Sequence, residues 1–199
     1  MKLALFGYGG HAREVACQIG GEVTFFVDSR YANGIAKPIS AFDPGEYTMM
    51  VAIADSKERH SVVQRLPNET KYFTFIHPST QIMDDNIEIG EGSFIGANSI
   101  LTTNIKLGKH ALLNRGNQIG HDCEIGDYFS SMPCAVVGGN VIIGSNVYLG
   151  SCSNIREKTK ITSNIIIGMN AAVINSIDTP GTYVGVPAKR QNPYKAEHI

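Results

Sequence analysis

The stretch that decides the fold runs from residue 137 to residue 155 and reads VGGNVIIGSNVYLGSCSNI. In this stretch an aliphatic residue returns at every sixth position, glycine often follows it, and asparagine often stands three positions after it. An α-helix needs a period of about 3.6 and an amphipathic strand a period of two, so neither explains the pattern. A short strand followed by a corner does, because asparagine and glycine adopt a positive φ at little cost.

The same period extends well beyond this stretch. The aliphatic positions are Ile89, Ile95, Leu101, Leu107, Leu113, Ile119, Ile125, Val137, Ile143, Leu149, Ile155, Ile161, Ile167 and Val173. Ser131 is the single break in the series. Three strands and three corners make a coil of 18 residues, so residues 89 to about 178 predict five coils of a parallel β-helix. Each coil buries its aliphatic row only against its neighbours, which makes the array cooperative.

The first part of the chain has a different pattern, typical of a small Rossmann-like α/β unit. The expected strands are residues 3–6, 23–27, 48–53 and 72–75, and the expected helices are residues 12–19 and 57–66. We place the domain boundary in Ile76-His77-Pro78, so that residues 1–76 form the α/β unit. Residues 77–199 then form the β-helix, a C-terminal turn and a tail.

A glycine-rich turn stands between the first strand and the first helix. Residues 7–12, GYGGHA, match the loose dinucleotide fingerprint G-x-G-x-x-[GA], and Asp28 closes the next strand. About 76 residues leave no room for the second half of a dinucleotide fold, but one such half can hold a nucleotide diphosphate, to which His11 would add a donor. A glycine turn that only joins strand to helix is the alternative.

The composition bounds the remaining possibilities. The chain has 17 Lys and Arg against 18 Asp and Glu, so there is no basic footprint for a nucleic acid or an anionic membrane. The apolar opening is too short for a signal peptide or a membrane span, and we expect a cytoplasmic protein. The four cysteines lack CxxC spacing, and buried free thiols are favoured over disulfides or a zinc site.

His121-Asp122 is the sharpest chemical signal within the repeat. The pair follows Ile119-Gly120 at a corner, where side chains face outward from the β-helix. An exposed histidine beside a carboxylate is suited to general-base catalysis, because imidazole exchanges protons near neutral pH. A solvated corner histidine explains the same spacing equally well.

Five segments together resemble the bacterial sugar acetyltransferases, and the resemblance covers nearly the whole chain. The segments are residues 7–11, 75–78, 113–127, 139–140 and 184–190. The family includes sialic-acid O-acetyltransferases and N-acetyltransferases of nucleotide-linked 4-amino-4,6-dideoxy sugars. The resemblance implies a left-handed β-helix, a homotrimer with active sites between subunits, acetyl-CoA along the coil edges, and chemistry without a metal.

The resemblance also implies roles for individual residues. His121 would be the base and Asp122 would raise its basicity, with the Gly139 N–H holding the thioester oxygen. The implied sugar-nucleotide contacts are Gly9, Gly10, His11, Asp28, Ser29 and Asn114. The implied acetyl-CoA contacts are Ser130, Gly139, Ser151, Met169, Lys189 and Arg190. Two of these depart from the family pattern, since Ser130 replaces a second histidine and Met169 stands where a glycine is common.

We therefore expect acetyl-CoA-dependent N-acetylation of a nucleotide-linked 4-amino sugar, in the synthesis of a surface polysaccharide or glycan. O-acetylation of a sugar hydroxyl, as in the sialic-acid enzymes, would use the same coils and base. From other classes, a non-catalytic nucleotide-binding scaffold and a zinc enzyme resembling the γ-type carbonic anhydrases are alternatives. The zinc enzyme needs three converging histidines, and His110 and His121 have no third partner in the repeat.

Overall fold

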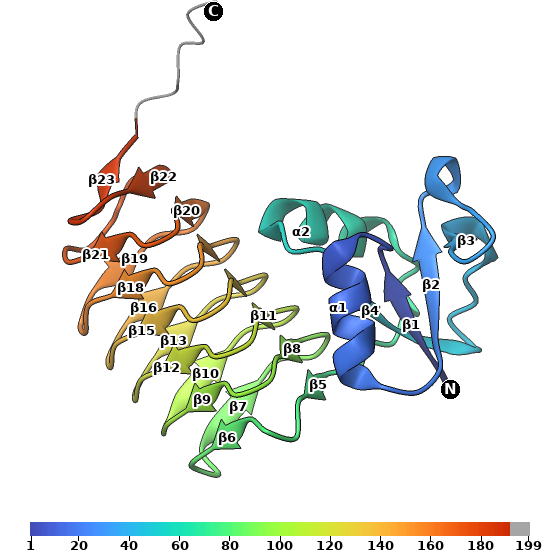
Figure 1. Cartoon of the computed structure of the whole chain (residues 1–199), viewed down its shortest axis with the longest axis horizontal. Helices are drawn as coiled ribbons and strands as arrows, with labels where there is room; N and C mark the ends of the chain where they lie inside the picture. Colours follow the sequence, from blue (N-terminus) through green and yellow to red (C-terminus); the bar gives the residue numbers. More distant parts are fainter. Residues whose placement is uncertain (192–199) are drawn as a thin grey trace, which may run out of the picture.

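Three parallel β-sheets line a β-helix in the computed structural model, which describes residues 1–191 (Figure 1). Sheet 1 contains β5 (Phe75–Ile76), β8 (Phe94–Ile95), β11 (Leu112–Leu113), β14 (Ser130–Ser131), β17 (Tyr148–Leu149), β20 (Ile165–Ile167), β22 (Gly181–Val184) and the antiparallel β23 (Lys189–Arg190). Sheet 2 contains β6 (Gln81–Ile82), β9 (Ile100–Leu101), β12 (Gln118–Ile119), β15 (Val136–Val137), β18 (Asn154–Ile155) and β21 (Ala172–Val173). Sheet 3 contains β7 (Ile87–Ile89), β10 (Ile105–Leu107), β13 (Glu124–Ile125), β16 (Ile142–Ile143) and β19 (Lys160–Ile161).

The register of the sheets confirms the predicted coil. Gln118 pairs with Val136 in sheet 2, and Glu124 pairs with Ile142 in sheet 3, each 18 residues further along. The β-helix begins earlier than the repeat predicted, because β5 and β6 already pair with the coil that follows them. These first strands were missed because the glycine punctuation is absent from them.

The corners have the backbone conformation that the asparagines predicted. From Asn98 to Asn170, twelve non-glycine residues have φ between 50° and 62°, spaced by multiples of six residues. Gly116 occupies the one position in this interval without such a residue, with φ 71°. The preceding glycines are needed for stacking, since a Cβ on Gly120 would lie only 2.6 Å from the backbone nitrogen of Gly139 in the next coil. The hexapeptide period is therefore a period of left-handed corners.

At the break in the repeat, a small Ser131 and a large Phe129 fill the interior of the β-helix together. Ser131 is completely buried where the other coils place an aliphatic residue, and Phe129, two positions earlier, is completely buried where the two preceding coils place the smaller Ser93 and Ala111. The Ser131 hydroxyl donates to the amide oxygen of Asn117, which is also completely buried. The Asn117 amide donates to the carbonyl of Asn114 over 2.5 Å. A buried polar pair is tolerated here because its groups find partners.

The N-terminal unit has a parallel sheet of order β3-β2-β1-β4. Its strands are β1 (Lys2–Phe6), β2 (Val23–Val27), β3 (Lys37–Pro38) and β4 (Tyr47–Val51), and its helices are α1 (Gly10–Ile19) and α2 (Ser56–Arg65). Short 3-10 turns are η1 (Ser29–Tyr31) and η2 (Ile39–Ala41).

The predicted strand over residues 72–75 is wrong. Tyr72 forms only a single bridge to Met49, and Phe75 belongs to β5 of the β-helix, so β3 is the fourth strand of the N-terminal sheet. Phe75 is drawn to the β-helix because its ring stacks on Phe94, with 5.7 Å between the ring centroids. The division at residue 76 stays a prediction, and the predicted tail at residues 192–199 lies outside the described residues.

The cysteines are free within the described chain, but only Cys123 is buried. Cys134 and Cys152 are exposed because each occupies the positive-φ corner position, with φ 61° and 58°. Cys17 is exposed on α1. The expectation of four buried thiols was therefore wrong for three of them.

Neither α1 nor α2, the helices of residues 1–191, has the length and apolar character to cross a bilayer.

Both helices of the N-terminal unit face sheet 1 of the β-helix (Figure 1). Ala12 and Val15 of α1 lie in one buried cluster with Phe94 and Leu112 of sheet 1. Apolar burial on the outer side of sheet 1 thus fixes one helix to the β-helix.

Arg59 of α2 completes the attachment and was not singled out in the sequence. Its side chain is 1% exposed, and all of its partners are uncharged oxygens. The acceptors are the carbonyls of Ile53, Ala54, His110, Tyr128 and Phe129 and the hydroxyl of Ser130. Burial lowers the pKa of Arg59 to about 10, which still leaves the guanidinium charged at neutral pH. One side chain therefore bridges α2 to two successive coils.

Replacing Arg59 by Met should loosen the attachment of the N-terminal unit. The substitution leaves several buried oxygens with one donor fewer, so we expect the free energy of unfolding to fall by roughly 3 kcal/mol. Circular dichroism during urea unfolding measures this change. Lys57→Met, on the exposed side of the same helix, is the matched control and should change stability by less than about 0.5 kcal/mol. Equal effects of both substitutions would contradict this role for Arg59.

Candidate functional site

A pocket of about 500 Å³ opens at the carboxyl ends of β1, β2 and β4. Its lining includes Gly9, Gly10, His11 and Asp28, four of the six residues predicted to hold a sugar nucleotide, together with Tyr31. Ser29, a fifth, is exposed at the start of η1 and does not line the pocket. Parallel α/β sheets bind ligands at this edge, because the loops there converge from different strands.

The glycines of the turn leave the start of α1 open. Gly9 caps the helix with φ −69°, no side chain caps the first turn, and that turn has no acidic residue. A Cβ added to Gly9 or Gly10 would meet nothing within 4 Å, whereas one on Gly7, with φ 117°, would lie 3.2 Å from the carbonyl oxygen of Ala52. Gly7 therefore serves the fold. Gly9 and Gly10 instead leave room beside the free N–H groups and positive dipole end of the helix, which favour an anion.

His11 borders this pocket and is largely buried. Its side chain is 16% exposed, and its Nε2 is buried without a hydrogen-bond partner in residues 1–191. Burial lowers the pKa of His11, although Glu14, with an oxygen 3.9 Å from Nδ1, acts in the opposite direction. The imidazole is therefore neutral at pH 7, and it can donate one hydrogen bond to a ligand.

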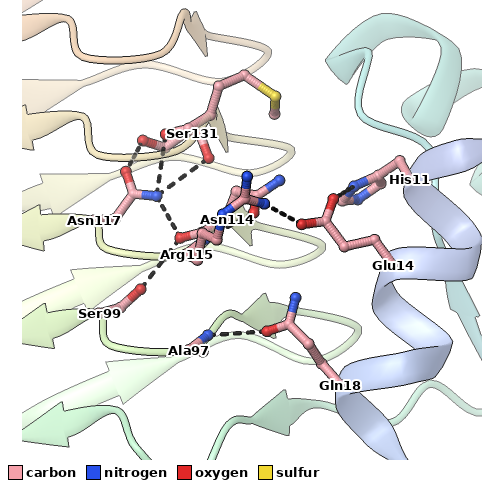
Figure 2. Close-up of polar contacts among 10 residues, drawn as sticks. His11, Glu14, Gln18, Ala97, Ser99, Asn114, Arg115, Asn117 and Ser131 are labelled. Carbon is pink, nitrogen blue, oxygen red and sulfur yellow. Dashed lines mark hydrogen bonds and ion pairs between the residues drawn. The ribbon is translucent and has the colours of Figure 1, made fainter.

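A polar chain leads from His11 to the β-helix. Figure 2 shows Glu14 between His11 and Arg115, with which it forms an ion pair. Gln18, further along α1, accepts a hydrogen bond of 3.0 Å from the backbone N–H of Ala97. Arg115 was missed in the sequence, where nothing marked it as different from a solvated corner charge.

Asn114, the predicted sugar contact, directly precedes this arginine at the corner after β11. It lies beside α1 (Figure 2) but is only 3% exposed. Its side-chain oxygen accepts a hydrogen bond of 2.7 Å from the N–H of Arg115. The structure thus places Asn114 on the side of the β-helix that faces α1, with its amide turned into its own corner.

Asp28 is already engaged by a residue that the sequence did not reveal. Arg65, at the end of α2, contacts both carboxylate oxygens, with N–O distances of 2.7 and 3.0 Å. Such a forked pair fixes the carboxylate in one orientation. Asp28 therefore faces the pocket with its charge largely neutralised.

His121 lies at a corner between sheet 2 and sheet 3 and projects outward, as predicted. Its side chain is 56% exposed, and its Nδ1 is 2.7 Å from Oδ2 of Asp122. The ring lies over Gly139 of the next coil, where a Cβ would come within 2.5 Å of Nε2. Because Asp122 holds Nδ1, Nε2 is the nitrogen left to accept a proton.

A polar hollow of about 450 Å³ lies beside this pair. It is lined by Asn104, Lys106, Asp122, Glu124 and Asn140. The hydrogen bond from Asn104, followed by that from His121, lowers the pKa of Asp122. Asp122 is therefore ionised throughout the range in which imidazole titrates.

The two halves of the candidate site do not meet within one chain. His121 stands between sheets 2 and 3, whereas the N-terminal unit covers sheet 1. In a three-sided β-helix the corner between two faces is opposite the third face. A ligand held in the pocket near His11 is thus on the far side of the β-helix from His121 of the same subunit.

The predicted acetyl-CoA contacts fall into separate groups. Ser151 and Met169 stack at the corner between sheets 1 and 2, where Asn170 N–H donates to the Ser151 carbonyl. Met169 is 73% exposed. Lys189 and Arg190 form the exposed strand β23. Gly139 lies under His121, at a different corner.

Ser130 differs from the other predicted acetyl-CoA contacts because it is completely buried. Its hydroxyl donates to Ala54 O over 2.7 Å and accepts from Arg59 over 2.8 Å, inside the contact between α2 and sheet 1. A side chain enclosed in this way cannot reach a ligand without opening that contact. We therefore leave Ser130 out of the proposed cofactor site.

His110, the other repeat histidine weighed for zinc, is buried under the N-terminal unit. Its ring stacks on Tyr128 at 5.2 Å and meets the edge of Tyr72 at 4.5 Å, and burial lowers its pKa to about 4. No three His, Cys, Asp or Glu side chains within residues 1–191 gather as metal ligands would.

Comparison with known proteins finds one matching domain family and several solved structures of similar fold. Residues 2–66 match the PglD N-terminal domain family. WeeI from Acinetobacter baumannii AYE is 28% identical, with a TM-score of 0.86 over 96% of this chain and 99% of that one. A mutant of perosamine N-acetyltransferase from Caulobacter crescentus, solved in complex with CoA and GDP-perosamine, has a TM-score of 0.87 over 97% and 98% of the chains, at 21% identity.

The sequence similarity to characterised relatives is confined to part of their length. GDP-perosamine N-acetyltransferase from Escherichia coli O157:H7 is 34% identical over 108 residues, which are 54% of this chain and 48% of that protein. The chain thus spans about half the length of this relative.

The fold and the site together define the class, a left-handed β-helix of hexapeptide repeats that begins with a PglD-type α/β unit. The predicted fold class is thereby confirmed, including the handedness that the repeat alone left open. Within this class, the chain is similar in sequence to part of GDP-perosamine N-acetyltransferase, and in fold to WeeI over nearly its whole length.

Proposed function

We propose that this protein transfers the acetyl group of acetyl-CoA to the 4-amino group of a nucleotide-linked 4-amino-4,6-dideoxy sugar, for surface polysaccharide or glycan synthesis. The observation that carries the proposal is the exposed imidazole of His121, whose Nδ1 is held by Asp122, so that Nε2 is the nitrogen left to accept a proton. Relatives with the same fold include an enzyme solved with CoA and GDP-perosamine, an amino sugar on a nucleotide.

The nucleotide half of the substrate is assigned to the N-terminal pocket. The open start of α1 at Gly9 and Gly10 offers N–H donors to the diphosphate, and neutral His11 can add one more. Asp28, with Arg65, borders the part of the pocket that would receive the base or ribose. Asn114 lies on the side of the β-helix that faces α1 (Figure 2), and we assign it to the sugar end of the substrate.

The reaction itself needs a base and an oxyanion donor. The amine nitrogen attacks the thioester carbonyl, a C–N bond forms, and the C–S bond to CoA breaks. His121 Nε2 takes a proton from the amine and returns it to the departing thiolate, while ionised Asp122 stabilises the imidazolium. The N–H of Gly139 is the candidate donor to the oxyanion. Lys189 and Arg190 are candidates for the phosphates of CoA, and Ser151 and Met169 for its pantetheine arm.

A homotrimer would bring the separated halves together. Since the pocket and His121 lie on opposite sides of one β-helix, the sugar amine must reach His121 of a neighbouring subunit. Three subunits packed side by side around a threefold axis would give three equivalent sites. An apolar hollow of about 380 Å³ on sheet 3, lined by Ile142, Ile161 and Ile177 among others, is a surface that such packing would bury.

The proposed reaction can be tested with purified protein, acetyl-CoA and a panel of UDP-, dTDP- and GDP-linked 4-amino sugars. We expect release of free CoA with one of them, and His121→Ala should lower kcat/KM by about 10²–10⁴-fold. A hydroxyl acceptor needs the base more than a neutral amine does, so sialic acid is included to separate O- from N-acetylation. Undiminished activity of the His121→Ala variant would remove this residue from the mechanism.

The pocket can be tested by adding a methyl group where the fold has room for it. Gly9→Ala and Gly10→Ala should leave the thermal midpoint unchanged, because no atom of the chain lies within 4 Å of the new Cβ. Affinity for UDP, GDP or dTDP, measured by calorimetry, should fall roughly tenfold because the diphosphate loses its close approach to the backbone. Gly34→Ala, equally unobstructed but outside the pocket, is the control. Retained affinity would place the diphosphate elsewhere.

The shared site can be tested by mixing two inactive chains. One chain carries His121→Ala and the other Gly9→Arg, which fills the pocket. Random assembly into trimers with sites between subunits should restore about one quarter of the wild-type sites. Free CoA release by the co-expressed mixture, compared with each variant alone, measures this. If each site is built within one chain, the mixture stays as inactive as its components.

A further inference from the structure

We propose that Asn104 is a positioning residue that holds Asp122, and through it His121, in the geometry required for proton transfer. The inference rests on the proposed function, since it concerns the same base. In this proposal Asn104 acts only through Asp122, with which it forms a hydrogen bond.

The contacts form a chain of three side chains on two successive coils. The amide Nδ2 of Asn104 donates to Oδ1 of Asp122 over 2.6 Å, and the other oxygen, Oδ2, is 2.7 Å from His121 Nδ1. Each carboxylate oxygen thus has its own partner. With both oxygens held, the carboxylate plane is fixed even though Asp122 is 45% exposed.

The backbone explains why these side chains meet. Asn104 and Asp122 occupy the same corner position, one coil apart, with φ 50° and 58°. The coils are tied together there by a hydrogen bond of 3.1 Å from Asp122 N–H to the carbonyl of Thr103. Because the two residues share a conformation and a stacking register, their side chains project in the same direction and lie one above the other.

Asn140 offers His121 Nδ1 a second hydrogen-bond partner, which would favour the other tautomer of the ring. Asn140, in the coil that follows, places its Nδ2 3.4 Å from the same nitrogen of His121. An amide N–H donor at Nδ1 would require the proton to sit on Nε2, which is the wrong tautomer for a base that acts through Nε2. Asp122 requires the opposite, a proton on Nδ1. Holding Asp122 at 2.7 Å therefore selects the reactive tautomer.

Charge supports the same assignment. The hydrogen bond from Asn104 is the largest contribution to the lowered pKa of Asp122. Lys106 and Glu124, the charged residues that line the same hollow, have opposite signs, so their effects on the carboxylate oppose each other. Asn104 is thus the neutral donor that stabilises the ionised carboxylate.

Two substitutions separate the role of Asn104 as a hydrogen-bond donor from its role in forming the positive-φ corner. Asn104→Asp keeps the size of the side chain but replaces the donor with an acceptor, and Asn104→Gly removes the side chain while allowing the positive φ. The control is Asn164→Gly. Asn164 has the same place in the six-residue repeat and a φ of 62°, but its corner lies between sheets 3 and 1, away from His121. Each variant is assayed for kcat and for both KM values. The His121 tautomer is read separately from the ¹⁵N chemical shifts of the ring in the unliganded protein.

We expect both Asn104 variants to lower kcat by roughly tenfold with both KM values within about twofold of wild type, as befits a lost hydrogen bond to a charged group. The fraction of neutral His121 protonated on Nδ1 should fall in both, while Asn164→Gly matches wild type in kcat and tautomer. Wild-type kcat, or an unchanged tautomer in the Asn104 variants, would overturn the proposal. Since the tautomer is measured without substrate, its result decides the role of Asn104 even if the proposed acetyl transfer fails.

Discussion

The left-handed corner, taken once every six residues, is the constraint on which the rest of the structure depends. Every corner from Asn98 to Asn170 repeats the same positive φ, so each coil stacks on the next in an 18-residue register. The register stacks residues that are 18 positions apart into columns that run along the β-helix. Asn104, Asp122 and Asn140 lie in one such column, and the environment of His121 is therefore a direct product of the repeat.

The attachment of the N-terminal unit adds the second constraint. Arg59 inserts a charged group among backbone carbonyls of two coils, and apolar side chains of α1 cover the neighbouring part of sheet 1. A buried guanidinium with several oriented acceptors holds one relative orientation, because any sliding would leave those groups unpaired. The pocket near His11 is thereby fixed on the side of the β-helix away from His121, which is why the proposed reaction requires a second subunit.

Predictions from the sequence succeeded where the physics is local. The corners, the glycine turn before α1 and the outward direction of His121 all depend on residues within a few positions of one another. They failed where distant contacts decide. Residues 72–75 read as a strand of the N-terminal sheet, but Phe75 pairs with the β-helix because it stacks on Phe94, 19 residues away. Ser130 read as a cofactor contact, but Arg59 and Ala54 enclose it.

The sequence by itself determined the period, the conformation of each corner and the outward direction of His121, because a backbone that turns every six residues needs asparagine, glycine or a similar residue at a set place. Only the tertiary structure decided which charged groups are paired. Arg65 with Asp28 and Arg115 with Glu14 are 37 and 101 residues apart. Such pairs depend on how coils stack and how helices dock, and no local pattern encodes those distances.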